Sequence, residues 1–371
     1  MSLHKALVRN LFNLRGWRTS RHLLVIESDD WGSVRMPSRE VYSKLLDAGV
    51  RLSKYGYEKV DTIASREDLA ALFEVCDKHR DVKGRSACIT ANCVVANPDF
   101  AKIEQNGYEQ YFYEPITVTM ERYYPGQSPF PVWQEGMRAK VFCPQFHGRE
   151  HVNVPLWIKT LQADVGGARL ACRNGVFSIV VATEFDRRGK NMAAWNYADD
   201  KEKEVIKQSL VEGMEFFRSI FGYNSESCIA PSYWWDDDLE ATLAGLGVKY
   251  LQGRHTHVVR GEKTYTYIGR RNSHGQIYLN RNADFEYSQE PNIDWNGDCL
   301  KDIAAAFRWH KPATISAHRL NFIGALDRKN RDDNLWLFDR LLSDIQKQWP
   351  DVEFLSTAEL GKQMEMSQEQ S

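Results

Sequence analysis

Short apolar segments alternate with amphipathic helical segments along the chain, and this alternation limits the possible folds more than any other feature. Apolar, partly β-branched segments predict strands, and apolar residues at helical spacing predict helices between them. Strands that are separated by helices pair in parallel, so this order predicts an α/β fold, as a wound sheet or a (β/α) barrel. The predicted strands are residues 23–27, 86–95, 140–146, 227–231, 248–252, 313–318 and 352–357, and the predicted helices are 65–80, 201–221, 236–247, 299–310 and 332–349.

Two segments interrupt this alternation. Residues 108–135 are rich in aromatic residues and proline, and residues 166–200 carry glycines and charges. We interpret both as insertions in a single domain, residues 1–371, whose core covers about residues 22–360.

Charge, cysteine content and hydropathy narrow the function classes. The net charge is −2, so no basic field indicates binding to nucleic acid or to an anionic membrane, and no apolar run is long enough to span a bilayer. Seven cysteines without a CxxC pattern favour reduced thiols over a disulfide framework. No apolar signal segment follows the basic N-terminus, so we expect a cytoplasmic protein. The sequence carries no signal for an oligomeric state.

Three carboxylates follow the first apolar strand. Glu27, Asp29 and Asp30 lie within four positions, although clustered anions repel and raise each other's pKa. A cation is therefore expected to compensate them.

The histidine pair His147 and His151 is the second cluster of this kind. Two imidazoles four residues apart can reach one metal ion, although unrelated histidines are also common on surfaces. The same letters match the inverted zincin pattern HxxEH, which requires a helix. Pro144, Gly148 and Pro155 argue against a regular helix at this place.

The predicted topology brings these clusters together. The carboxyl ends of parallel strands open on one face of an α/β barrel, and active sites lie there. Two histidines and one carboxylate are a common set for a catalytic divalent cation. His318 ends the predicted strand 313–318 at the same face, where a histidine can serve as a general acid or base.

With these residues in place, the chain resembles a divergent polysaccharide deacetylase of the carbohydrate esterase family 4 type. Five family motifs occur in the family's order between about Leu23 and Thr357. They are matched by Asp29-Asp30, by His147 and His151, by Pro231 and Tyr233 in IAPSY, by Asp294-Trp295, and by His318 in SAH.

The resemblance implies a function and a role for each matched residue. It implies a metal-dependent hydrolase that removes N- or O-linked acetyl groups from a carbohydrate, on a distorted (β/α) barrel of about seven strands. One divalent cation, for which zinc is favoured, is held by Asp30, His147 and His151. The remaining roles are general base for Asp29, general acid for His318, a backbone contact to the substrate near Tyr233, a pocket wall for Trp295, and polarisation of His318 for Asp294.

The chain departs from the family at two positions. Ile229 stands where the third motif has an arginine that orients the base, and Arg319 stands where an aspartate usually follows the last histidine. Two alternatives stay open. A glycoside hydrolase needs two carboxylates about 5–9.5 Å apart, for which Asp29 with Asp236 or Glu27 are candidates. A non-catalytic sugar-binding relative would bind without turnover.

Overall fold

The computed structural model describes residues 3–53, 56–181, 190–259 and 261–369. Its centre is a nine-stranded sheet in which every strand pair is parallel. The pairing order is β10 (Ile277–Asn280), β7 (Tyr250–Gly253), β6 (Ser227–Ile229), β5 (Phe142–Phe146), β2 (Ile89–Cys93), β1 (Leu23–Trp31), β12 (Ala313–His318) and β11 (Ala283–Phe285), with β13 (Glu353–Leu355) also on β1.

This sheet confirms the predicted parallel α/β architecture and corrects its details. The barrel was expected to have about seven strands, whereas the sheet has nine. Within the described residues, β10 and β11 end the pairing order and are not paired with each other, so the sheet does not close. Both are short strands with polar residues on either side in the sequence, which hides them from a search for apolar segments.

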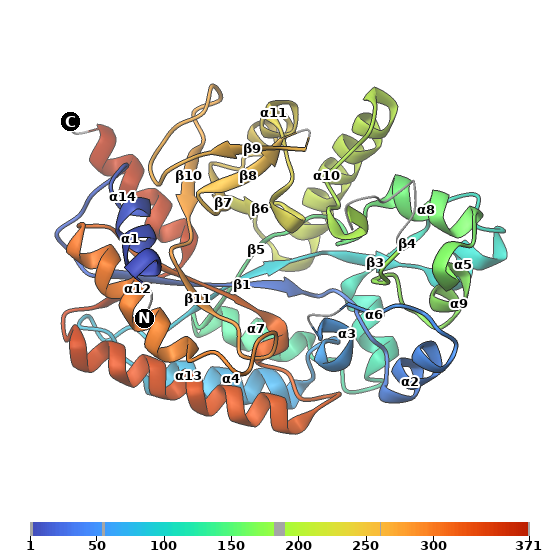
Figure 1. Cartoon of the computed structure of the whole chain (residues 1–371), viewed down its shortest axis with the longest axis horizontal. Coiled ribbons are helices and arrows are strands. Elements are labelled where there is room, and N and C mark those ends of the chain that lie inside the picture. The colour runs from blue at the N-terminus through green and yellow to red at the C-terminus, as the bar shows by residue number, and fades with distance from the viewer. Residues whose placement is uncertain (1–2, 54–55, 182–189, 260, 370–371) are drawn as a thin grey trace.

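Helices cover the sheet, and β1 runs through the middle of the molecule (Figure 1). Helix α12 packs against β11 and β12, α7 and α10 pack against β5, and α14 packs against β1. Helices α4 and α13 lie side by side, and α1 contacts α12. The bounds are α1 (Leu3–Phe12), α4 (Arg66–Lys78), α7 (Phe130–Arg138), α10 (Asp200–Phe221), α11 (Asp237–Gly245), α12 (Trp295–Arg308), α13 (Arg328–Gln348) and α14 (Thr357–Glu369).

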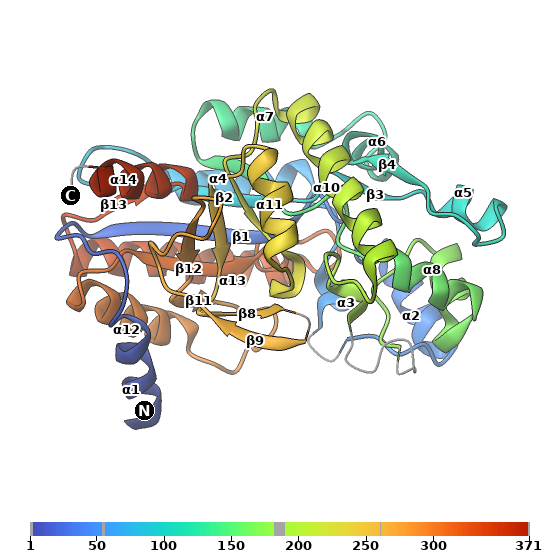
Figure 2. The same cartoon turned by 90° about the horizontal axis from the view of Figure 1, so that it is seen from above.

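A smaller group of helices lies at one end of the molecule, beyond the carboxyl end of β1 (Figures 1 and 2). It has its own apolar core, in which Trp157, Leu161 and Phe177 are buried. This group, called here the end lobe, consists of α2 (Arg39–Asp47), α5 (Phe100–Gln105), α8 (Val154–Gln162) and α9 (Ala168–Arg173). Near it lie α3 (Tyr57–Val60), α6 (Ile116–Tyr123) and the antiparallel pair β3 (Ala96–Pro98) and β4 (Tyr113–Pro115).

Local sequence signals explain where the main helices start and stop. Ser65 and Asp68 form a capping box at the start of α4, and Asp199 caps α10. Helix α10 ends at Gly222, whose φ of 82° suits glycine. A second antiparallel pair, β8 (Thr256–Val259) and β9 (Glu262–Tyr265), extends beyond β7. In the part of the chain described above, no helix is long and apolar enough to cross a membrane.

The two interrupting segments fold against this core. Residues 108–135 form β4, α6 and most of α7. Residues 166–200 include α9 and the 3-10 turn Lys190–Met192, and residues 182–189 lie outside the described ranges. Their status as insertions in one domain stays a prediction.

Candidate active site

A bulge at the end of β1 turns two adjacent carboxylates toward one cavity. The register between β1 and β2 shifts between Ser28 and Trp31, and Asp30 has a φ of 73°. Bulges re-aim side chains that would otherwise alternate across a strand. Gly32 completes the turn at a φ of 85°, where a Cβ atom would lie 2.7 Å from the Val94 carbonyl oxygen. As a result, Asp29 and Asp30 both line a cavity of about 800 Å³.

Asp30, His147 and His151 meet in the lining of this cavity. One ligand atom from each residue lies within 4.8 Å of the other two, and all three side chains are buried. The Nε2 atoms of His147 and His151 lie 3.4 and 3.0 Å from Asp30 Oδ1. Both histidines follow β5, so the convergence of the two sequence clusters at the carboxyl ends of the strands is observed.

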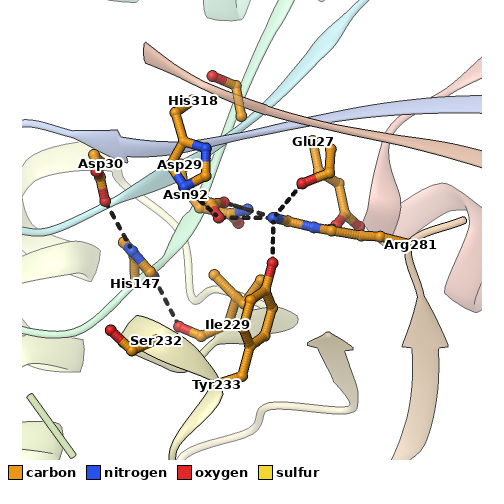
Figure 3. A network of polar contacts seen from close by, with 12 residues as sticks. Glu27, Asp29, Asp30, Asn92, His147, Ile229, Ser232, Tyr233, Arg281 and His318 are labelled. Carbon is orange, nitrogen blue, oxygen red and sulfur yellow. Dashed lines mark hydrogen bonds and ion pairs between the residues drawn. The ribbon is translucent and has the colours of Figure 1, made fainter. Parts of the chain in front are cut away.

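The ring orientation of His147 fits a metal ligand. Its Nδ1–H donates to the carbonyl oxygen of Ile229 at 2.9 Å (Figure 3). With Nδ1 held by that hydrogen bond, Nε2 is turned toward Asp30, buried and without a hydrogen-bond partner. Such an orphaned nitrogen beside a carboxylate is what a cation would satisfy.

The charges at this end of the cavity also suit a cation. Burial, opposed in part by Asp30, lowers the pKa of His151 to about 4, so its imidazole is neutral, the form that binds metals. Burial alone would raise the pKa of Asp30, but Arg35 and the two histidines hold it well below its ordinary value. Arg35 donates to Asp30 Oδ2 at 2.8 Å and leaves Oδ1 facing the histidines.

Arg281 holds the second carboxylate, Asp29, through both oxygens. Its terminal nitrogens donate to Oδ2 at 2.7 Å and to Oδ1 at 2.6 Å, and its Nε donates to Glu27 at 2.5 Å (Figure 3). Asn92 adds a hydrogen bond to Oδ1 at 2.7 Å. Burial alone would raise the pKa of Asp29, but the charge and hydrogen bonds of Arg281 lower it below its ordinary value. Asp29 is therefore an anion at neutral pH.

His318 faces Asp29 from the neighbouring strand. Asp29 on β1 and His318 on β12 are direct partners in the parallel ladder, and Nε2 lies 3.9 Å from Asp29 Oδ2. Nδ1 donates to Glu286 at 2.5 Å. Burial alone would lower the pKa of His318, but Glu286 and the two aspartates raise it to about 10. The imidazole is thus a cation at neutral pH, next to an anionic carboxylate.

Of the remaining predicted site residues, Tyr233 lines the cavity, whereas Asp294 and Trp295 do not. Tyr233 follows β6 in a tight turn in which Ser232 and Tyr233 have φ values of 58° and 59°, and its hydroxyl accepts a hydrogen bond from Arg281 at 3.3 Å. Asp294 caps α12, and Trp295 lines a separate cavity and donates to the Glu290 carbonyl. The carboxylate that accepts a hydrogen bond from His318 is Glu286, not Asp294.

The two departures from the family pattern have structural counterparts. Ile229 supplies its carbonyl oxygen to His147, while the guanidinium on Asp29 comes from Arg281 instead of from position 229. Arg319 is fully buried and donates to Asp61 at 3.0 and 2.8 Å and to the Ser33 carbonyl at 2.7 Å. It therefore ties the end of β12 to the segment that follows α3.

The carboxylates of the glycoside hydrolase alternative are engaged elsewhere. Glu27 accepts from Arg281 and Thr357 and does not line the cavity. Asp236 caps α11, also lies outside the cavity and bonds to Tyr197.

Sequence reasoning missed Arg281, Glu286, Asn92 and Arg35. Arg281 and Glu286 flank the short strand β11, and Asn92 lies on β2. Their only sequence signal is a polar residue on or next to a strand, which is too common to single them out.

No family model and no curated protein matches the chain. Among solved structures, it resembles 4-α-glucanotransferase from Thermococcus litoralis at 8% identity and a TM-score of 0.45, covering 91% of this chain but only 40% of that one. It resembles an α-amylase from Thermotoga maritima at 9% identity and a TM-score of 0.45, covering 92% and 74% of the two chains. It resembles a peptidoglycan deacetylase from Bacillus subtilis at 10% identity and a TM-score of 0.36, covering 94% and 93%.

Proposed function

We propose that this protein is a metal-dependent hydrolase that removes an N- or O-linked acetyl group from a carbohydrate. The observation that carries the proposal is the pairing, in one cavity, of two sets of residues. The first is the buried ligand set of Asp30, His147 and His151. The second is an anionic Asp29 3.9 Å from a cationic His318.

The charges of Asp29 and His318 support their proposed roles as base and acid in amide or ester hydrolysis. Asp29, ionised by its contacts with Arg281, would accept a proton from the attacking water. His318, protonated because of Glu286, would donate a proton to the leaving nitrogen or oxygen. Groups of this kind contribute roughly 10²–10⁴-fold each to the rate. The tight hydrogen bonds of Arg281 make Asp29 a weak base, but one that stays ionised across the neutral range.

A divalent cation bound by Asp30, His147 and His151 would polarise the acyl carbonyl and lower the pKa of water. Two imidazoles and one carboxylate favour zinc. The orphaned Nε2 of His147 and the neutral His151 support this assignment.

Neither alternative function has equal support. Apart from Asp29 and Asp30, the described part of the cavity offers one further carboxylate, Glu58, which accepts from the Ser53 backbone N–H. A glycosidase acid–base pair would therefore have to use Glu58 as its second member. The non-catalytic alternative arises because Ile229 replaces the arginine that orients the base in the family. Arg281 supplies a guanidinium to Asp29 in its place, which disfavours this alternative.

The test is release of acetate by the zinc-reconstituted protein from N-acetylated and O-acetylated oligosaccharides, measured together with release of free sugar. We expect acetate without sugar, loss of activity with a chelator, and loss of activity in Asp30→Asn. The matched control is Asp236→Asn, which keeps a residue that can cap α11 outside the cavity and should retain activity. Sugar release, or acetate release that persists without metal, would contradict the proposal.

A further inference from the structure

We infer that the cavity next to the catalytic residues holds a linear aliphatic chain of the substrate, longer than an acetyl group. This inference rests on the proposed function for the position of the bond that is cleaved. It goes beyond that function because it names a second chemical component of the substrate.

The lining of the cavity has two chemically different parts. One consists of Asp29, Asp30 and the three histidines. The other, called here the aliphatic wall, consists of Leu46, Val50, Leu52, Ile179, Val180 and Val181, with the polar residues Arg51, Ser53 and Ser178 on the same segments. The cavity volume of about 800 Å³ is in the range of cavities that enclose ligands much larger than an acetyl group. An acetyl group at the ligand set would leave the aliphatic wall uncovered.

The aliphatic wall is a built part of the end lobe. Two segments form it, the end of α2 with the turn after it and the extended residues 178–181. They are joined by a hydrogen bond from Val180 N–H to the Arg51 carbonyl at 2.8 Å. Val50 packs closely on Gly167. A Cβ atom added to Gly167 would lie 2.8 Å from Val50 Cγ2. Val50, Ile179 and Val181 are buried in the core of the lobe, so the wall has a fixed shape.

Two residues of the aliphatic wall are exposed to solvent, as are the lining residues Arg51 and Ser232. Leu46 and Val180 are 45% and 42% exposed, although both line the cavity. Large apolar side chains that are exposed together around a cavity indicate an apolar ligand, because their exposure to water is unfavourable.

The lining does not match a site for sugar rings alone. Sugar rings are usually held on free aromatic faces, yet no tryptophan lines the described part of this cavity. Its two tyrosines are engaged. Tyr57 packs edge-to-face on His318 with Arg35 on its ring, and the Tyr233 hydroxyl accepts from Arg281. The aliphatic wall offers a methylene chain van der Waals contacts that a hydroxylated ring cannot use.

The chain could belong to the acyl group or to the sugar, and the experiment separates these sources. One series consists of N-acyl glucosamines with acyl chains of two to eight carbons, and the other of alkyl N-acetylglucosaminides with the same chain lengths. Binding is measured by calorimetry and turnover by release of the acid. In one of the two series we expect affinity and kcat/KM to rise about two- to fourfold per methylene, the upper figure being equivalent to about 0.8 kcal/mol.

Variants locate the effect on the proposed wall. Val180→Asn should lower the affinity for the eight-carbon ligand relative to the two-carbon ligand by about tenfold or more, because a polar group is placed against the chain. Val118→Asn on α6 is the matched control, since Val118 is similarly exposed, at 48%, but lines none of the described cavities. In this control, the ratio of the affinities for the eight-carbon and two-carbon ligands should equal that of the wild type.

The outcomes keep this inference separate from the proposed function. Affinity that rises with chain length, without release of any acid, supports the aliphatic site and refutes the hydrolase. Acetate release with no dependence on chain length in either series refutes the aliphatic site and leaves the hydrolase intact. If Val180→Asn does not reduce the gain in affinity with chain length, the aliphatic chain binds elsewhere and the inference is overturned.

Discussion

Replacing Arg281 by methionine should destabilise the protein strongly, because one guanidinium compensates two buried carboxylates. Its side chain is completely buried, and it makes hydrogen bonds of 2.5–2.7 Å to Glu27 and Asp29. Without it, Asp29 keeps Asn92 as a donor and Glu27 keeps Thr357. Removing one partner of a buried ion pair costs about 3–5 kcal/mol, a large part of the roughly 5–15 kcal/mol that stabilises a typical domain.

The loss of folding stability in Arg281→Met should depend on pH, and the charge of Asp29 determines the direction. In the wild type, the pKa of Asp29 lies below its unfolded value, so its contribution to stability is fully present above about pH 4. In Arg281→Met, burial raises the pKa of Asp29 above its unfolded value, so the folded state binds a proton that the unfolded state releases. The variant therefore loses stability as pH rises, and its penalty should be larger at pH 8 than at pH 5.

Urea unfolding at pH 5 and pH 8 measures both quantities. The double variant Glu27→Gln/Arg281→Met has one buried carboxylate without an arginine partner, whereas Arg281→Met has two. The double variant should therefore be more stable than Arg281→Met alone. The control Arg328→Met removes an arginine that is 73% exposed and paired with exposed Glu67, and its effect should stay below about 1 kcal/mol at both pH values. A penalty for Arg281→Met below about 1 kcal/mol, or one that does not shrink at pH 5, would refute this reasoning.

Four further predictions concern the metal, the acid, its partner and the thiols. His147→Ala should keep its circular dichroism spectrum but lose bound zinc when metal content is measured after dialysis, and metal retained at wild-type stoichiometry would exclude His147 as a ligand. His318→Asn should lower kcat by about 10²–10⁴-fold with metal content unchanged, and combining it with Asp29→Asn should cost less than the product of the two losses, which steady-state kinetics will test. Glu286→Gln should move the alkaline limb of the pH–rate profile from about pH 10 toward the ordinary histidine value, because the neutral amide no longer stabilises the imidazolium, and an unmoved limb would mean that another group controls it. All seven cysteines are unpaired, so the denatured, unreduced protein should titrate seven thiols, and five or fewer would indicate a disulfide.

The parallel sheet and the convergence of Asp30 with His147 and His151 could be predicted because their signals are local. The strand at Leu23 is apolar and abruptly ends in carboxylates, and the pair His147 and His151 occupies a short motif. Parallel topology then places strand ends on one face, which was enough to bring Asp30 and the histidines together without knowledge of any contact.

The residues around the acid and the base could not be predicted because they come from distant segments without a pattern. Arg281 is 252 positions from Asp29, and Glu286 reaches His318 only because β11 pairs with β12. Asp294 was chosen for its motif, but its side chain caps α12, a local role that aspartate often takes before a helix. The bulge at Asp30 depends on the register with β2, which no single strand encodes.

The proposed acid and base are cross-strand partners, and this arrangement has an evolutionary consequence. Because Asp29 and His318 are opposite each other in the β1–β12 ladder, their separation is inherited from the backbone spacing of the sheet. The aliphatic wall, in contrast, lies on α2 and on extended residues of the end lobe, outside the sheet. Substitutions and length changes in the lobe can therefore alter which substrates are accepted while the reacting groups keep their geometry. A deletion of one residue in β12 would instead separate the pair at once, so divergence within such a lineage should accumulate in the lobe and spare the length of that strand.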